Sequence, residues 1–167
     1  KDSIDEIILN GKIARDPKQI ANSFNKFFAN IGPTLAAKIP KTSRKFTEYL
    51  KINISNSLFL KPTDCQEIEQ VIHSLKNSSS KGYDDLSVNT IKDCSSLFSK
   101  PLCIIFNKSI EEGIVPNDLK IAKIIPIFKS DDKKLVPNYR PISVLPAFSK
   151  ILERLIYNRL LDDKKKI

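Results

Sequence analysis

Hydrophobic positions recur at helical spacing early in this chain. The first such stretch begins at Asp16-Pro17, a capping residue followed by proline at the first helical position, and Gly32-Pro33 is expected to stop it. The apolar stripe between them consists of Ile20, Phe24, Phe27, Phe28 and Ile31. Three phenylalanines on one face are able to stack nucleic-acid bases, but such a stripe is far more often packed core, and that is the main interpretation.

Four more helices are predicted further along the chain. Thr63 with Gln66 forms a capping box for the first, residues 87–98 form the second, and Pro101 opens a third that Gly113 ends. The fourth carries the last long apolar face. The expected inward residues are Ile68, Val71, Ile72 and Leu75, then Leu102, Ile105, Phe106 and Ile110, and finally Phe148, Ile151, Leu152, Leu155, Ile156 and Leu160.

A strand–loop–strand unit precedes the last helix. Ile121–Phe128 is short, apolar and β-branched, which favours a strand, and Pro126 within it indicates an edge or a bulge. Ser130–Asn138 has the composition of an exposed connection, and Tyr139–Leu145 returns as a second strand. The pattern therefore predicts a helix-rich α/β (α+β) fold, with N-terminal helices followed by a small antiparallel sheet and a packing helix.

Two stretches carry weaker patterns. Lys1–Ile13 is either a tether or a short strand, and Lys38–Lys61 is the least patterned part of the chain and is expected to be a flexible linker. The chain is accordingly divided into an N-terminal helical extension with its linker, residues 1–61, and a second region, residues 62–167.

The charge of the chain is positive and uneven. Its 167 residues include 28 basic and 19 acidic ones, for a net charge of +9, and Lys123–Lys166 alone holds 11 basic against 5 acidic residues. A basic face is the sequence-independent footprint of nucleic-acid binding, because neutralised phosphates release counterions. The basic tail Lys164–Lys166 is on its own more often solvated. Charge is therefore permissive for a nucleic-acid partner without requiring one.

Several absences narrow the classes of protein. The chain has no Met and begins at Lys1, so we expect either an internal piece of a longer protein or a processed product. No apolar run is long enough to cross a bilayer and no signal peptide is present, which predicts an intracellular protein of the nucleus or cytoplasm. Cys65, Cys94 and Cys103 are predicted to be small apolar side chains, and His73 to lie on the surface. These residues cannot form a zinc site of typical spacing.

Lys129 and Arg140 stand at the two ends of the predicted connection between the strands. Ionised donors form short, strong hydrogen bonds to phosphate. Arg grips two oxygens in a fork, whereas Lys acts as a point charge. The pair therefore suits an anionic ligand. The alternative, which composition alone favours, is that both side chains are merely solvated.

Three motifs around this hairpin resemble a known family. Pro126–Lys129 matches P-I-x-K, Asn138–Ser143 matches N-Y-R-P-I-S, and Lys150–Glu153 matches K-I-x-E. In this order they resemble the fingers region of non-LTR (LINE-type) retrotransposon reverse transcriptases. The resemblance implies that Lys129 and Arg140 bind the triphosphate of the incoming deoxynucleotide. It also implies that residues 62–167 are an incomplete fingers region without the palm.

A loop ahead of the second predicted helix resembles the family pattern S-x-G-x-D-G-I. The residues to which the resemblance assigns a template-backbone contact are Ser80, Lys81, Gly82 and Asp84. Tyr83 stands where proline is usual and Asp85 where glycine is usual, which puts a Cβ and a negative charge near that contact. Tyr83-Asp84-Asp85 is not interpreted as a polymerase metal motif, because that motif needs its aspartates at the turn of an apolar hairpin.

The resemblance implies RNA-templated DNA synthesis with Mg²⁺ for the parent enzyme. The catalytic aspartates of the family lie downstream of Ile167, so we expect no catalytic residue, no bound metal and no polymerase activity in this chain alone. Expected partners are an RNA template, a DNA primer, a dNTP and the remaining palm and thumb, with no membrane. Two alternatives stay open: a non-catalytic nucleic-acid-binding module from a decayed or co-opted element, and a helical protein-interaction domain.

Overall fold

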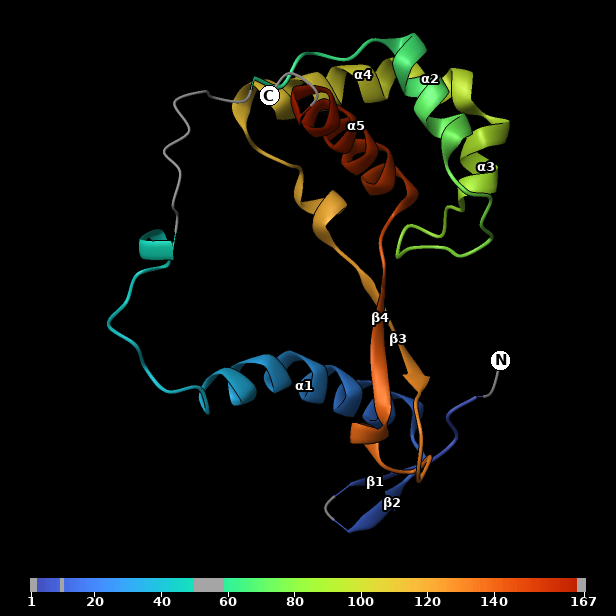
Figure 1. Ribbon diagram of the computed structural model, residues 1–167. Coiled ribbons are helices and arrows are strands. Elements are labelled where there is room, and N and C mark those ends of the chain that lie inside the picture. The colour runs from blue at the N-terminus through green and yellow to red at the C-terminus, as the bar shows by residue number, and fades with distance from the viewer. Residues whose placement is uncertain (1–2, 10, 50–58, 165–167) are drawn as a thin grey trace. The chain divides into compact units, whose positions relative to one another are not determined.

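The computed structural model, drawn as a ribbon in Figure 1, describes residues 3–9, 11–49 and 59–164. Helices hold 54% of the described residues and strands 13%. Both small sheets are antiparallel. These proportions confirm the predicted helix-rich mixed fold with its small antiparallel sheet.

The chain forms two compact units that are not continuous in sequence. The first consists of residues 1–53 and 124–142, and the second of residues 54–123 and 143–167. The N-terminal segment thus shares a unit with most of the strand hairpin. The predicted boundary at residue 61 separates an N-terminal extension from a fingers region. That assignment of roles to residues 1–61 and 62–167 stays a prediction.

The first unit contains the β1–β2 sheet, most of the β3–β4 sheet and the long helix α1 (Figure 1). One predicted alternative for the N-terminal stretch, a short strand, is confirmed. It pairs antiparallel with a second strand, with Ile8 opposite Ile13, and Gly11 between them has a left-handed φ of 75°. The elements of this unit are β1 (Ile7–Leu9), β2 (Lys12–Ala14), α1 (Pro17–Ala36), η1 (Phe46–Tyr49), most of β3 (Lys123–Phe128), η3 (Val136–Asn138) and most of β4 (Tyr139–Val144).

The predicted start of α1 is confirmed, but its predicted end is wrong. The Asp16 carboxylate accepts a hydrogen bond of 2.8 Å from the Gln19 N–H, and Pro17 occupies the first turn. The helix nevertheless runs through Gly32-Pro33 to Ala36. Proline removes only its own N–H from the ladder, and the Ala37 N–H still donates to the Pro33 carbonyl over 2.9 Å. The helix tolerates the one hydrogen bond that Pro33 cannot donate, and it ends about one turn after the predicted stop.

A small apolar core joins α1 to the hairpin of β3 and β4. Its buried members are Ile7, Ile20, Phe24, Val136 and Tyr139. The Phe24 and Tyr139 rings meet edge to face with centroids 4.9 Å apart. Phe27 and Phe28 are partly buried against the same cluster, so the core interpretation of the phenylalanine stripe is confirmed. Ile31 is 40% exposed and was wrongly assigned to it.

The hairpin of β3 and β4 follows the prediction within two residues at each end. The two strands form a sheet of their own, so Pro126 lies in an edge strand as expected. The connection is less simple than predicted, because it contains η3 and buries Val136. Of the predicted linker, residues 38–45 and 47–49 are exposed and η1 forms within it, while residues 50–58 lie outside the described residues.

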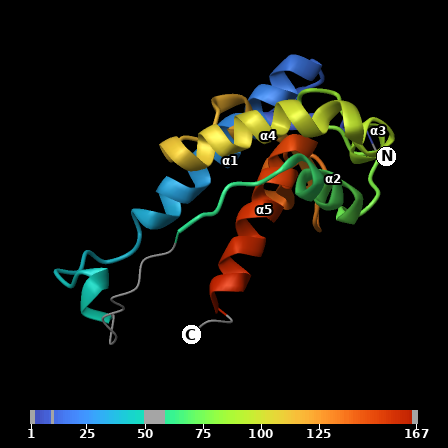
Figure 2. The ribbon, with the colours of Figure 1, turned by 90° about the horizontal axis from the view of Figure 1, so that it is seen from above.

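The second unit is a cluster of helices, seen from above in Figure 2. Its elements are α2 (Cys65–Ser74), α3 (Val88–Asp93), α4 (Ser95–Glu112), η2 (Asn117–Lys120) and α5 (Ala147–Lys164). Their apolar faces share one core, whose largest fully buried side chains are Phe106, Ile68, Ile72, Ile91, Ile151 and Leu155. This core confirms the predicted inward faces of α2 and α5, apart from Leu160, which is 46% exposed.

The boundaries around α4 differ from the prediction. The helix expected over residues 87–98 is interrupted at Cys94, and Pro101 lies inside α4 instead of opening it. The buried face of α4 includes Ser99 as well as Leu102 and Phe106, so tertiary packing extends the helix upstream of its proline. Ile105 is 42% exposed, contrary to prediction, whereas the C-terminal stop is confirmed by a left-handed Gly113 with φ 67°.

The cap of α2 lies one residue later than predicted. Asp64 is the N-cap, and its carboxylate accepts from the Glu67 N–H over 2.8 Å. Thr63 has other partners: its hydroxyl donates to Glu67 Oε2 over 2.8 Å, and its N–H donates to Asn107 Oδ1 on α4 over 2.8 Å. A contact across 44 residues of sequence therefore moves the cap.

Candidate functional site

Lys129 and Arg140 lie on the exposed face of the β3–β4 hairpin. The Lys129 N–H donates to the Asn138 carbonyl over 2.8 Å. Beside this hydrogen bond, the Phe128 and Tyr139 rings meet edge to face with centroids 5.6 Å apart. Phe128 and Tyr139 thus share one face, and Tyr139 is buried in the core. Because successive side chains of a strand alternate, Lys129 and Arg140 share the other face, and both are exposed.

The cations of the hairpin have different surroundings. Lys134 Nζ lies 2.7 Å from Glu6 Oε1, and the hydrogen bond from Lys134 lowers the pKa of the Glu6 carboxyl, assisted by Arg15. That contact ties the connection to the start of β1. Neither Lys129 nor Arg140 makes an ion pair with any residue in the described ranges. The structure therefore brings these two predicted residues to one face, where their charge is not neutralised by a described carboxylate.

The predicted template loop forms a tight turn ahead of α3 in the second unit. Lys81 and Ser87 form an isolated antiparallel bridge across it. Asp84 Oδ1 accepts from the Leu86 N–H over 3.3 Å, so this carboxylate stabilises the turn itself. Gly82 is buried, whereas Ser80 and Lys81 are exposed. The loop thus presents two of its four predicted contact residues to solvent and uses the other two for its own structure.

The two departures from the family loop have structural partners. The Tyr83 hydroxyl donates to the Asp118 carbonyl of η2 over 3.1 Å, which anchors the loop where proline would stiffen it. Asp85 adopts a left-handed φ of 56° at the position where glycine is usual. Asp is one of the few residues with a side chain that adopts this conformation readily. The backbone requirement of this position is therefore met by Asp85 without glycine.

Replacing Gly82 with alanine is expected to destabilise the second unit by about 1–3 kcal/mol, because an added Cβ meets a packed backbone. It would lie 3.0 Å from both the Cα and the N of Pro146. Urea unfolding of the purified chain measures the effect. Gly32→Ala is the matched control: nothing lies within 4 Å of its Cβ, and alanine favours the helix. Equal stability of Gly82→Ala and wild type would contradict the close approach.

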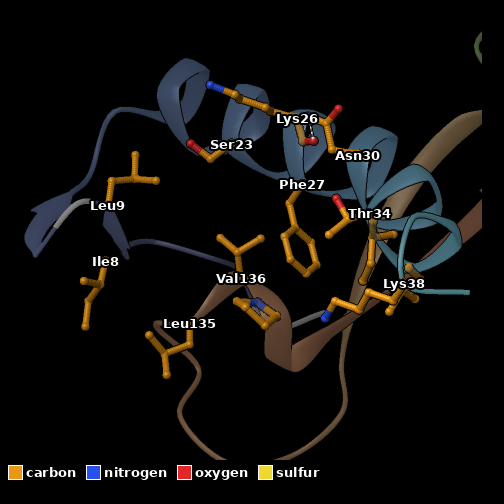
Figure 3. Close-up of a pocket in the computed structure, with 13 residues that line it drawn as sticks. Ile8, Leu9, Ser23, Lys26, Phe27, Asn30, Thr34, Lys38, Leu135 and Val136 are labelled. Atoms are coloured by element: carbon orange, nitrogen blue, oxygen red, sulfur yellow. Dashed lines mark hydrogen bonds between the residues drawn. The ribbon is translucent and has the colours of Figure 1, made fainter.

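A pocket of about 830 Å³ opens between α1, β1 and the hairpin connection within the first unit (Figure 3). In Figure 3, Phe27 points from α1 toward Val136. The sequence pattern had placed Phe27 in a stripe interpreted as packed core, and it did not predict a pocket beside it. The lining residues are Ile8, Leu9, Ser23, Lys26, Phe27, Asn30, Ile31, Thr34, Leu35, Lys38, Leu135, Val136 and Pro137. None of the predicted site residues lines this pocket.

No group of three or more His, Cys, Asp or Glu side chains in the described part of the chain is placed to hold a metal ion. Cys65, Cys94 and Cys103 are free and partly buried, and burial raises the pKa of the Cys103 thiol. His73 is exposed, as predicted, beside the Ser95 hydroxyl. No described helix has both the length and the apolarity of a membrane span.

Comparisons with known proteins point to one group of relatives. The chain is 37% identical over 122 residues to the RNA-directed DNA polymerase from mobile element jockey of Drosophila melanogaster, and 34% identical over 119 residues to that of Drosophila funebris. It is 30% identical over 153 residues to a probable RNA-directed DNA polymerase from transposon BS of Drosophila melanogaster. These matches cover 72%, 71% and 91% of this chain. No protein-family model matches it.

The matched stretch is a small part of each relative. It spans 13% of each jockey polymerase and 17% of the transposon BS protein. The expected resemblance to non-LTR reverse transcriptases is confirmed for the kind of relative, whereas the assignment to the fingers region stays a prediction. These three homologues of the chain are RNA-directed DNA polymerases of Drosophila non-LTR retrotransposons, and the chain shares 30–37% identity with them over most of its length.

Proposed function

We propose that this chain is the N-terminal extension and fingers region of a non-LTR retrotransposon reverse transcriptase, inactive by itself. In the parent enzyme it would contact the RNA template, the DNA primer and the incoming dNTP, and it would dock on the palm and thumb. The identities of its relatives support the class of enzyme. The geometry of the β3–β4 hairpin supports a contact with the nucleotide, and that of the loop before α3 supports a contact with the template.

One observation carries the nucleotide role. The hairpin buries Tyr139 on one face and exposes Lys129 and Arg140 on the other. A guanidinium and an ammonium on one face suit a triphosphate, because the first binds two oxygens and the second supplies a mobile point charge. The buried face holds both cations on a defined backbone, which reduces the entropy lost on binding.

The template role belongs to the loop before α3. Ser80 and Lys81 are exposed and offer a hydroxyl and an ammonium to a phosphate, while Gly82 and Asp84 shape the turn. The parent reaction uses Mg²⁺, which needs a cluster of carboxylate ligands. The described residues offer no such cluster. They therefore do not fit that metal.

Titration of the ¹⁵N-labelled chain with inorganic triphosphate tests the nucleotide role. Saturable amide shifts are expected in the β3–β4 hairpin, and Lys129→Ala/Arg140→Ala is expected to weaken binding about tenfold, or 1.4 kcal/mol, since two charge-assisted contacts are lost. The matched control is Lys100→Ala/Lys108→Ala, which removes the same charge from exposed positions on α4.

Two results would contradict this role. Equal weakening by both double variants would mean that triphosphate responds only to net charge. Shifts confined to other elements would move the site away from the hairpin.

A chain that binds a primer–template but not triphosphate would favour the non-catalytic nucleic-acid module. A chain that binds neither at low salt would favour a protein-interaction domain, because phosphate contacts are strongest at low salt.

A further inference from the structure

The polar face of α5 carries a second candidate contact for nucleic acid. We propose that it holds one nucleotide of a single-stranded segment, with the base on Tyr157 and Arg154 and the phosphate on Lys150. The inference rests on the proposed function, since it assumes that the parent enzyme handles a nucleic-acid strand. It adds a surface to which the sequence motifs assigned no contact, although Lys150 and Glu153 belong to the K-I-x-E motif.

A groove of about 520 Å³ defines this surface. Its lining residues are Leu75, Lys150, Glu153, Arg154 and Tyr157. Lys150, Arg154 and Tyr157 are spaced i, i+4 and i+7, so they form one stripe along α5. The opposite face of the helix is buried in the core of the second unit through Ile151, Leu152 and Leu155. Packing therefore fixes the direction in which the stripe points.

The side chains of the groove have the chemistry that binds an unpaired nucleotide. The Arg154 guanidinium carbon lies 5.5 Å from the centroid of the Tyr157 ring, and Tyr157 is 49% exposed. Aromatic rings and guanidinium planes stack on bases of any sequence. Lys150, one turn before Arg154, supplies a point charge for the phosphate. Leu75, which follows α2, adds an apolar wall against which a base is able to pack.

The charge of the groove favours an anion but is not uniformly positive. Lys150 and Arg154 oppose one carboxylate, that of Glu153. None of the three makes an ion pair within the described part of the chain. A bound phosphate would be attracted by two cations and repelled by Glu153. Glu153→Gln is therefore expected to tighten binding of a single strand, whereas it would leave a purely apolar ligand unaffected.

The absence of tryptophan from the chain gives a direct test of stacking. Tyr157→Trp introduces a single reporter whose emission a stacked base quenches. Short oligo(dT) and oligo(rU) are titrated separately, so that DNA and RNA strands are distinguished, and a duplex of the same length is added in a third arm. Saturable quenching by single strands is expected. Tyr49→Trp is the control, since Tyr49 is 64% exposed on η1 and lies in the other unit.

Anisotropy with the same oligonucleotides separates stacking from charge. Tyr157→Ala is expected to weaken binding about tenfold with an unchanged salt slope, because it removes a base contact. Lys150→Ala is expected to reduce the slope of log affinity against log salt by about 0.7, because one phosphate contact is lost. Tyr157→Phe keeps the ring and is expected to bind like wild type. Circular dichroism checks that each variant is folded.

Three results would overturn the inference: no quenching of Tyr157→Trp by single strands, equal quenching by the duplex, or wild-type affinity in folded Tyr157→Ala. Its failure is distinguishable from failure of the proposed function. If triphosphate still shifts the amide signals of the β3–β4 hairpin while oligonucleotides do not bind at α5, only the proposal for α5 is contradicted. If α5 binds oligonucleotides while triphosphate shifts no hairpin amide, the nucleotide role of Lys129 and Arg140 is lost instead.

Discussion

Replacing Tyr139 with alanine is expected to destabilise the first unit by about 3–5 kcal/mol, the range for removing a buried aromatic side chain. Tyr139 is only 7% exposed, its ring contacts Phe24 and Phe128 edge to face, and its hydroxyl donates to the Lys133 carbonyl over 2.6 Å. The small core of this unit has no second aromatic residue from β4. Loss of the ring should therefore free the hairpin from α1, and Arg140 should then lose its fixed orientation.

Hydrogen exchange followed by mass spectrometry measures this effect locally. In Tyr139→Ala, amides of α1 and the hairpin should exchange faster, while those of α4 and α5 should be unchanged. Tyr139→Phe is the matched control: it keeps the ring and loses one hydrogen bond, worth about 1 kcal/mol. Triphosphate binding should fall in Tyr139→Ala although both cations are intact. Unchanged exchange and binding would show that Tyr139 does not hold the hairpin.

Replacing Arg159 with methionine is expected to destabilise the second unit by about 3 kcal/mol, because it leaves a partly buried carboxylate without its cation. The Arg159 side chain is 12% exposed and binds Glu67 in a two-point ion pair, with Nη2 at 2.7 Å from Oε2. It also donates to the carbonyls of Lys61 and Pro62 over 3.1 and 3.0 Å. One guanidinium thus joins α5 to the start of α2.

Urea unfolding measures the cost, and an exposed ion pair is the control. Lys108 lies 3.6 Å from Glu112 on α4, and such surface pairs contribute less than about 1 kcal/mol. Lys108→Met should therefore have little effect. The hydrogen bond from Arg159 lowers the pKa of Glu67, so the contribution of the pair is present above pH 4.5 and is lost as the pH falls below that value. Glu67→Gln should remove this part of the acid dependence.

A cost near zero for Arg159→Met would mean that the pair only offsets the desolvation of its own charges. The double variant Glu67→Gln/Arg159→Met distinguishes the two cases. If most of the loss comes from the unpaired carboxylate, the double variant should be more stable than Arg159→Met alone.

Local chemistry made some elements predictable. Asp16-Pro17 carries both the cap and the fixed φ of a helix start, and Gly113 supplies the left-handed residue that ends α4. The β3–β4 hairpin was predictable because its apolar runs are short, β-branched and separated by a polar connection. The cations Lys129 and Arg140 were predictable as a pair for the same reason, since they flank that connection.

Other features depend on residues that are distant in sequence. Pro33 and Pro101 looked like helix boundaries, yet each lies inside a helix whose packing outweighs one lost hydrogen bond. The α2 cap moved to Asp64 because Thr63 binds Asn107, and Arg159 pairs with a carboxylate 92 residues away. No local pattern encodes such pairs, since their energies arise only when the helices meet.

By itself, the sequence determined which segments form helices and hairpins, where the positive charge accumulates, and to which polymerases the chain is related. Periodicity also predicted the inward faces of α2 and α5. The tertiary structure decided that Ile31, Ile105 and Leu160 of the predicted faces are exposed, and which face of the β3–β4 hairpin is buried. Burial of Tyr139 turns Lys129 and Arg140 outward, and burial of Ile151 and Leu155 turns Arg154 and Tyr157 outward. The physical reason is that periodicity defines the faces of an element, whereas only packing against another element selects the face that excludes water.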